Sequence, residues 1–326
     1  MLGIGGSGKT TFSKQMQIIH QGNFDEERAK SYTSILLTNI LLGLKAIATE
    51  VKDLEDTENY KISRWVQTLD ENQAQWNEEL IGKVKALWGD PGILKTWKDI
   101  KDGVIIQLDY LMDNLDRFVS PGFIPTNDDI LRARQRTTGE LLSTFEDQKY
   151  QWNLIDVGGQ FAERVKWAKI FESPTPQAII FFLAIDEYNV PNTELKTEHH
   201  KTKLELALSV FKDYLCDAGP VLEKKLCRIV FLNKVDVFSE KIQNPAKFAE
   251  FKRALGYEGE ESAEKCAAAV RERMAAIAAE SKLAKGEHNE VYFHVTNALD
   301  TSLMTKVTQE IKKSIITSTM QDLGLA

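Results

Sequence analysis

The sequence predicts an α/β protein with a mostly parallel sheet and an all-helical insertion near its start. After about residue 122, short apolar runs alternate with helical stretches, which is typical of a parallel sheet covered by helices on both faces. Residues 25–120 instead place apolar side chains at helical spacing and carry no strand signal of comparable quality. The chain of 326 residues is long enough for one large domain or two ordinary ones.

The helical insertion contains three recognisable stretches. The first, residues 26–54, repeats apolar side chains three to four residues apart, and the stretches 77–90 and 104–118 have the same texture. The sequence Asp-Pro-Gly at 90–92 predicts a break between helices. The apolar positions of the first stretch are Ile35, Leu36, Ile40, Leu44 and Ile47.

Four apolar runs predict the strands of the α/β part. They lie in residues 150–159, 177–186, 226–236 and 290–298, and helices are expected between them at 202–215 and 262–284. The final stretch predicts an amphipathic helix that packs on the sheet through Leu303, Val307, Ile311 and Ile315. We therefore expect an α/β domain at 1–21 and 122–326 and a helical domain at 22–121.

Composition narrows the class of protein. Apolar residues make up 43% and charged residues 27%, and the net charge of −7 argues against a broad nucleic-acid surface. Cys216, Cys227 and Cys266 form no CxxC pair, which favours reduced thiols and a cytoplasmic protein. No signal peptide and no run of about 18 apolar residues is evident, so we expect no transmembrane segment.

The stretch GIGGSGKTT, residues 3–11, matches the phosphate-binding P-loop pattern. Its glycines let backbone N–H groups converge on phosphate oxygens, and the following helix N-terminus favours negative charge. Lys9 is expected on the β- and γ-phosphates and the Thr10 hydroxyl on Mg²⁺. The alternative is a glycine-rich loop without a ligand. The predicted phosphate-binding residues are Gly5, Gly6, Ser7, Gly8, Lys9, Thr10 and Thr11.

Two further motifs follow predicted strands. Asp156 can hold Mg²⁺ through water, and the Gly159 amide can sense a γ-phosphate, although a turn with Asp and Gly is common. Asn233, Lys234 and Asp236 form an NKxD motif. The Asp236 carboxylate can accept hydrogen bonds from guanine N1–H and the 2-amino group, a donor pair that adenine lacks. This favours guanine over the alternative of an ATP-using P-loop protein.

The spacing of these motifs resembles that of a heterotrimeric G protein α subunit. The helical insertion lies between the P-loop and Asp156, and further similar stretches are KQMQIIH, FIPTNDDILRARQRTTG, DVGGQFAERVKW, FLNKVDVF and the closing DLGLA. The resemblance covers nearly the whole chain. It implies a Ras-like P-loop GTPase domain with an inserted helical domain, which binds GDP or GTP with Mg²⁺ and hydrolyses GTP slowly.

The same resemblance implies the remaining site residues. Arg134 is expected as a built-in arginine finger, Thr137 as the second Mg²⁺-binding hydroxyl and Gln160 as the residue that orients the attacking water. Leu131 and Arg132 would lie near the ribose and Ala298 against guanine, while Trp167 would report the state of the switch or serve as a core aromatic. Implied partners are a βγ dimer, a G protein-coupled receptor and an effector at the cytoplasmic face of the plasma membrane.

Several positions depart from the family pattern. The family has an N-terminal helix and a strand before the P-loop, so we expect an N-terminally truncated sequence. Gly6 replaces a P-loop glutamate, and Phe161 replaces the arginine after the catalytic glutamine. His199 and His200 lie in a divergent segment, where solvation is a simpler interpretation than metal binding. These departures keep open the alternative of a non-enzymatic relative that acts as a binding module.

Overall fold

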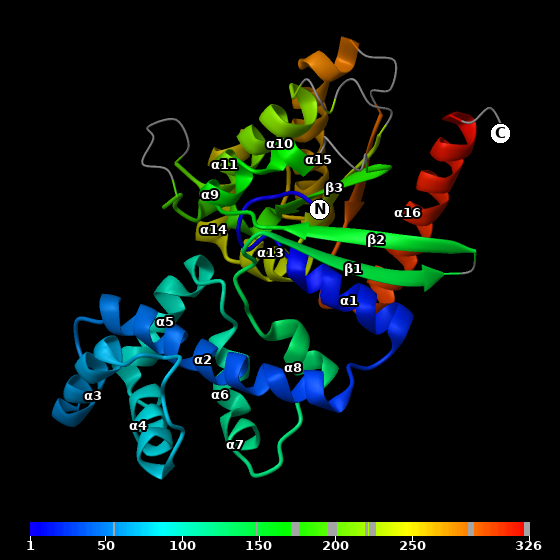
Figure 1. Cartoon of the computed structure of the whole chain (residues 1–326). Helices are drawn as coiled ribbons and strands as arrows, with labels where there is room; N and C mark the ends of the chain where they lie inside the picture. Colours follow the sequence, from blue (N-terminus) through cyan, green and yellow to red (C-terminus); the bar gives the residue numbers. More distant parts are fainter. Residues whose placement is uncertain are drawn as a thin grey trace. The chain divides into compact units, whose positions relative to one another are not determined.

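The computed structural model describes residues 1–54, 56–147, 149–170, 176–194, 201–218, 221, 226–285 and 290–322. The chain folds into two compact units, unit 1 with Met1–Gly22 and Arg136–Ala326, and unit 2 with Asn23–Gln135 (Figure 1).

Unit 2 consists of helices around one central apolar helix. That helix, α2 (Glu26–Glu50), begins where Asp25 accepts a hydrogen bond from the Arg28 amide at 2.8 Å. It fully buries Leu36, Ile40 and Leu44. The other elements are α3 (Thr57–Thr68), α4 (Glu78–Trp88), α5 (Pro91–Ile100), η1 (Lys101–Gly103), α6 (Leu108–Asp113), α7 (Leu115–Phe118) and α8 (Asn127–Arg132).

Two details of unit 2 differ from the sequence-based expectation. The expected helix at 104–118 begins only at Leu108 and is interrupted at Asn114, which separates α6 from α7. The unit also extends to Gln135, beyond the expected domain end at 121. The segment after α8 is held to α2 because Asn39 exchanges hydrogen bonds with the Arg134 backbone at 2.6 and 2.9 Å. The functional domain boundaries remain a prediction.

Helix α2 is the one helix in the described residues that is long and apolar enough to cross a membrane by length and composition. Half of its most apolar stretch is buried inside unit 2. A core helix meets the same criterion, so this is weak support for a membrane span.

Unit 1 contains two groups of strands. Strands β1 (Glu140–Asp147) and β2 (Tyr150–Val157) pair antiparallel. Strands β3 (Ala178–Ala184), β4 (Cys227–Asn233) and β5 (Val291–Val295) pair parallel in the order β3-β4-β5. The four strands predicted from sequence are confirmed. Strand β1 was missed because most of its residues are exposed, so it carries no continuous apolar run.

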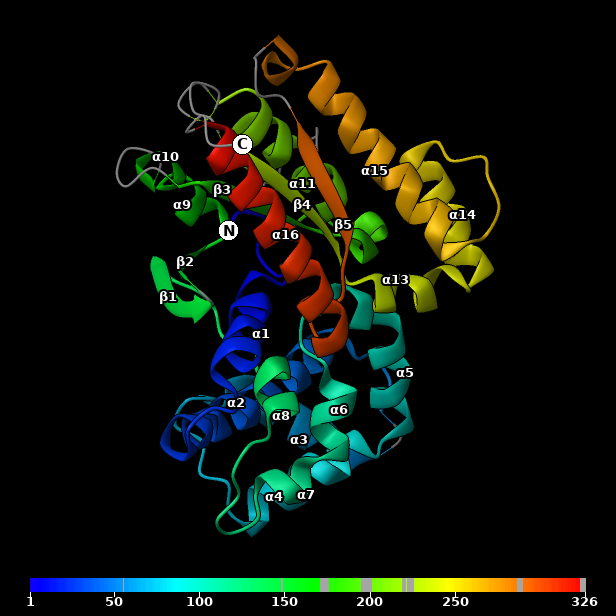
Figure 2. The same cartoon turned by 90° about the vertical axis from the view of Figure 1, so that its right-hand side faces the viewer.

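Helices cover both faces of the β3-β4-β5 sheet (Figure 2). On one face, α1 (Lys9–Gln21) and α16 (Thr301–Asp322) pack through Phe12, Met16 and Ile311 against Phe182 and Phe231. The stripe predicted for the final helix is confirmed, since its four apolar residues belong to this cluster. On the other face lie α11 (Lys203–Phe211), α13 (Val235–Ile242), α14 (Pro245–Leu255) and α15 (Ala263–Ala279).

Short elements complete the described part of unit 1. They are α9 (Phe161–Arg164), α10 (Trp167–Ile170), η2 (Ile185–Asn189), the π-helical η3 (Lys212–Cys216) and η4 (Lys282–Lys285). The three cysteines are buried free thiols.

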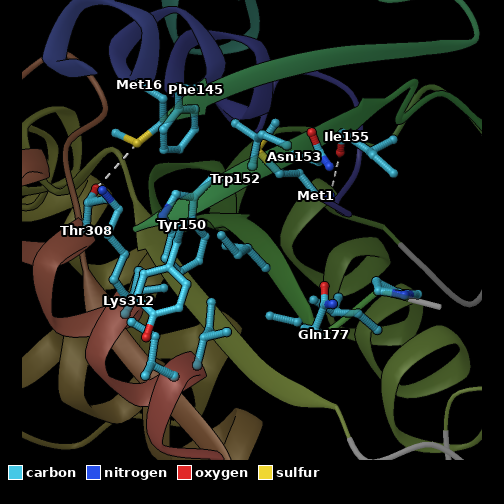
Figure 3. A pocket seen from close by; sticks show the side chains of 18 of the residues that line it. Met1, Met16, Phe145, Tyr150, Trp152, Asn153, Ile155, Gln177, Thr308 and Lys312 are labelled. Atoms are coloured by element: carbon cyan, nitrogen blue, oxygen red, sulfur yellow. Dashed lines mark hydrogen bonds between the residues drawn. The ribbon is translucent and has the colours of Figure 1, made fainter. Parts of the chain in front are cut away.

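An apolar groove of about 580 Å³ lies between β2 and β3 (Figure 3). Met1 and Leu2 occupy one side of it, where Leu2 forms a single parallel bridge with Phe181. The amide of Leu2 donates to the Ile180 carbonyl at 2.8 Å, and the Met1 amino group donates to the Ile155 carbonyl at 2.7 Å. These two residues therefore link β2 to β3 and lead directly into the glycine-rich loop.

Candidate functional site

The glycine-rich loop runs from Leu2 into the N-terminus of α1. Gly3, Gly6 and Gly8 have φ values of 139°, 83° and 103°, which side chains rarely adopt. A Cβ atom at Gly8 would overlap the Asn233 amide, so glycine is also required there for close approach. The loop ends at Gly8, the N-cap of α1, which leaves the first amides of this helix available for an anion.

Lys9 lies beneath this loop. Its ammonium group donates to the carbonyl oxygens of Gly3 at 2.8 Å and Ile4 at 3.1 Å, and the residue is only 5% exposed. Burial lowers the pKa of Lys9 to about 8, although the negative charge of Asp156 opposes this shift. A phosphate near Lys9 would favour its charged form and restore the ordinary ionisation.

Three oxygen-bearing side chains meet beside the loop. The Thr10 hydroxyl donates to Asp156 Oδ2 at 2.7 Å and lies 2.7 Å from the Thr137 hydroxyl, which is 3.5 Å from the same carboxylate oxygen. Asp156 is completely buried, and its Oδ1 has no hydrogen-bond partner. Hard oxygen donors of this kind fit Mg²⁺, which usually keeps several waters and phosphate oxygens as further ligands.

Binding of Mg²⁺ beside the loop does not require a dense cluster of charged metal ligands. The described residues contain no group of three His, Cys, Asp or Glu side chains that could hold a metal. A magnesium ion here would depend on the Thr10 and Thr137 hydroxyls, with Asp156 acting through water.

Gly159 and Gln160 follow β2 and approach the glycine-rich loop. A Cβ atom at Gly159 would overlap the Gly3 carbonyl and the Lys9 ammonium group, so this backbone passes very close to the loop. Gln160 is the N-cap of α9, and its side-chain amide lies against Gly5. The structure therefore brings Gly159, the predicted γ-phosphate sensor, and Gln160, the predicted water-orienting residue, against the glycine-rich loop.

Asn233, the last residue of β4, joins the glycine-rich loop to the loop that follows β5. Its amide nitrogen donates to the Ser7 carbonyl at 2.8 Å, and its oxygen accepts from the Thr296 hydroxyl at 3.1 Å and the Ala298 amide at 3.2 Å. Asp236 is exposed on the first turn of α13, and Ala298 is 5% exposed. The NKxD motif is thus fixed to the glycine-rich loop through a buried amide.

Three predicted site residues, Leu131, Arg132 and Arg134, lie in unit 2. Leu131 is buried at the end of α8, and Arg132 pairs with Asp128 and lies 4.5 Å from the centroid of the Tyr110 ring. The Arg134 backbone is held by Asn39. Their approach to a nucleotide remains a prediction.

Sequence reasoning missed an ion pair that supports Gly159. Arg164 is 2% exposed, donates to the Gly159 carbonyl at 3.0 Å and pairs with Glu194 at 2.8 Å. Residues on two distant segments form this contact, and neither belongs to a nucleotide motif. Phe161, one of the departures from the family pattern, is 51% exposed, and the centroid of its ring lies 5.6 Å from the Arg164 guanidinium carbon.

Trp167 lies at the base of the same segment. It is fully buried, donates to the Gly158 carbonyl at 3.0 Å and meets the Tyr214 ring edge to face at 4.9 Å. It is therefore a core aromatic that also contacts the segment before Gln160. His199 and His200, considered above for metal binding, lie outside the described residues.

Comparison with known proteins shows the family of this chain. A family model described as G-protein alpha subunit matches residues 1–315. The whole chain is 34% identical to a guanine nucleotide-binding protein alpha-2 subunit from Dictyostelium discoideum, of which it covers 90%. It is also 33% identical to a G(o) subunit alpha from Planorbella trivolvis and 32% identical to an alpha-16 subunit from Caenorhabditis elegans, with all of this chain and 89% of each relative covered. The chain belongs to the G-protein α-subunit family.

Proposed function

We propose that the loops converging in unit 1 form a Mg²⁺-dependent site that binds GTP and positions water for its hydrolysis. As a member of its family the chain is a guanine nucleotide-binding GTPase and a signal transducer, and the proposal concerns which residues do this work. The convergence of Thr10, Thr137 and Asp156, which come from three separate segments, is the observation that carries it.

The phosphates would lie on the loop amides of Gly5 to Thr11, with Lys9 at the β- and γ-phosphates. Thr10 and Thr137 would supply hydroxyl ligands to Mg²⁺, and Asp156 would hold a water in its coordination shell. The ion neutralises phosphate charge when it is bound. The unpartnered Oδ1 of buried Asp156 supports this assignment, since such an oxygen is costly unless a ligand or water satisfies it.

The guanine base would lie by the NKxD motif, with Asp236 selecting its N1–H and 2-amino donors. Asn233 supports this end of the site by tying the motif to Ser7 and Ala298. We assign Ala298 to the face of the base, Lys234 to its other side, and Leu131 and Arg132 to the ribose.

Hydrolysis would depend on Gln160 and Arg134. The Gln160 amide would orient water toward the γ-phosphorus, and the Arg134 guanidinium would neutralise charge that grows on the phosphate oxygens in the transition state. Glycine at position 5 leaves space for the Gln160 side chain, because a Cβ there would overlap its amide.

Loss of the γ-phosphate would release the segments around Thr137 and Gly159 and change the surface available to partners. We assign this surface to a βγ dimer and an effector, with a receptor acting on α16, at the cytoplasmic face of the plasma membrane. Family membership implies heterotrimeric G protein partners in general.

The test is single-turnover GTP hydrolysis by Gln160→Leu. We expect hydrolysis to fall by about 100-fold or more, while GTP affinity stays within about threefold, since the side chain acts mainly in the transition state. Gln243→Leu, at an exposed position, is the control and should behave as the wild type. Trp167 fluorescence on addition of Mg²⁺ and a non-hydrolysable GTP analogue gives an independent readout.

Unchanged turnover in Gln160→Leu would remove the assignment of that residue. Absence of saturable GDP binding by the wild type, with Mg²⁺ present, would overturn the proposed site as a whole.

A further inference from the structure

Two buried carboxylates lie outside every nucleotide motif. Asp186 and Glu187 follow β3 in η2 and are 6% and 2% exposed. Charged side chains are rarely buried this completely unless they are paired, so the position of their partners is informative.

Both carboxylates face Lys234, the second residue of the NKxD motif. The Lys234 ammonium group is 3.7 Å from Asp186 Oδ2 and 3.6 Å from Glu187 Oε1. Lys234 is also the one non-glycine residue with positive φ, 62°, in the part of the chain that the structure describes. Such a backbone is strained for an L-residue and persists where its surroundings hold it.

Two other lysines complete this cluster. Lys203 is 3.3 Å from Glu187 Oε1, and the Lys241 ammonium group donates to the Asp186 carbonyl at 2.8 Å. Even so, Asp186 Oδ1 and Glu187 Oε2 are buried without hydrogen-bond partners. Three ammonium groups therefore surround two carboxylates here, and Lys234 is the one among them that belongs to the NKxD motif.

The geometry points to Asp186 and Glu187 as positioning residues that hold Lys234 in place and thereby set the lifetime of bound guanine nucleotide. This inference rests on the proposed role of Lys234 at the base. The carboxylates do not touch the nucleotide in this scheme. They fix a long, flexible side chain whose freedom would otherwise be lost only on binding, and such preorganisation slows ligand release.

The experiment measures dissociation of a fluorescent GDP, 2′/3′-N-methylanthraniloyl-GDP, from the full chain. We expect Glu187→Gln and Asp186→Asn each to speed release by about tenfold, with Glu187→Asp closer to the wild type, because a Lys234 side chain that is no longer held must be ordered at the nucleotide at an entropic cost. Glu250→Gln is the matched control, since Glu250 binds Asn189 in the same η2 segment at 2.5 Å without contacting Lys234.

A double-mutant cycle separates positioning from general loosening. In a Lys234→Met background, the Glu187→Gln change should no longer accelerate release, because its target is gone. Thermal unfolding of the nucleotide-free variants is followed in parallel, and a Glu187→Gln protein that does not fold is replaced in the cycle by Asp186→Asn.

Three results would overturn the inference: release at the wild-type rate from both carboxamide variants, equal acceleration by Glu250→Gln, or the same acceleration in the Lys234→Met background. Failure of the proposed nucleotide site is a different outcome, since the wild type itself would then not bind the fluorescent GDP.

Discussion

Asp129 in unit 2 and Asp156 in unit 1 are both completely buried carboxylates, yet their surroundings differ. Both Asp129 oxygens are satisfied, because they accept from the Tyr110 hydroxyl at 2.7 Å, the Arg117 guanidinium at 2.6 and 2.7 Å and Thr126 at 2.8 Å. Asp156 accepts from two threonines on one oxygen and has no partner on the other.

The same contrast extends across the two units. The buried oxygens of Ser7, Asp156, Asp186 and Glu187 that lack hydrogen-bond partners all belong to unit 1, and no such side-chain atom is found among the described residues of unit 2. The fully satisfied carboxylate of Asp129 supports its own fold, whereas the open oxygen of Asp156 is available to a ligand. We therefore expect substitutions of Asp129 and of Asp156 to affect different quantities.

The largest effect on stability is expected for Asp129→Asn. This change removes the charge that pairs with Arg117 and weakens the capping box of α8, so the free energy of unfolding should fall by about 3 kcal/mol. Asp156→Asn should change it by less than about 1 kcal/mol while greatly weakening Mg²⁺-dependent nucleotide binding. Urea denaturation without nucleotide and GDP titration with Mg²⁺ measure the two quantities.

Asp128→Asn is the control for unit 2, since Asp128 is adjacent in sequence but mostly exposed in its pair with Arg132. The comparison between the units fails if Asp156→Asn destabilises the nucleotide-free protein as much as Asp129→Asn does.

An effect of opposite sign and at most similar size is expected for Asp186→Asn. Burial raises the pKa of Asp186 to about 6, although Lys234 opposes this shift. The folded state therefore binds this proton more tightly than the unfolded state, and stability is lost as pH rises from about 4 to about 6. Removing the charge should stabilise the nucleotide-free protein at neutral pH by up to about 3 kcal/mol.

Urea denaturation of the wild type and of Asp186→Asn at a series of pH values measures this difference. The free energies of unfolding of the two proteins should diverge between about pH 4 and pH 6 and should stay apart above pH 6. If the free energies of unfolding of the two proteins stay a constant distance apart through this pH range, the charge of Asp186 does not destabilise the folded state.

The sequence predicted best those parts of the site that are formed by consecutive residues. The glycine-rich loop and the strand preceding Asn233 are contiguous patterns, and the structure places them as expected. Family membership also favours the GTPase prediction over the ATP-using and non-enzymatic alternatives. The roles of the individual site residues stay predictions.

The features that the sequence did not predict are formed by contacts between residues far apart in the chain or by strand pairing. Strand β1 is stabilised by pairing with β2, although its own side chains are mostly exposed. Arg164 and Glu194 meet across a long sequence separation and match no nucleotide motif. The carboxylates of η2 match none either, and they meet Lys234 of the NKxD motif only in the folded chain. Their side chains look like ordinary surface charges until the fold buries them.

The pH dependence of nucleotide affinity gives the smallest expected effect and the finest test of the comparison. Lys9 is buried against loop carbonyls with a pKa lowered, chiefly by burial, to about 8. Bound phosphate favours the ammonium form and raises this pKa, so binding takes up a proton above about pH 8. GDP affinity should then fall by about tenfold as pH rises from about 7.5 to 9.5.

Lys9→Arg is the comparison, because its side chain keeps its charge throughout this range. It should bind GDP more weakly, but its affinity should depend less on pH, and any titration of the base itself is common to both proteins. Identical pH profiles of GDP affinity for the two proteins would mean that phosphate does not bind at Lys9. The buried polar groups of unit 1 would then lack the ligand that distinguishes them from the satisfied charges of unit 2.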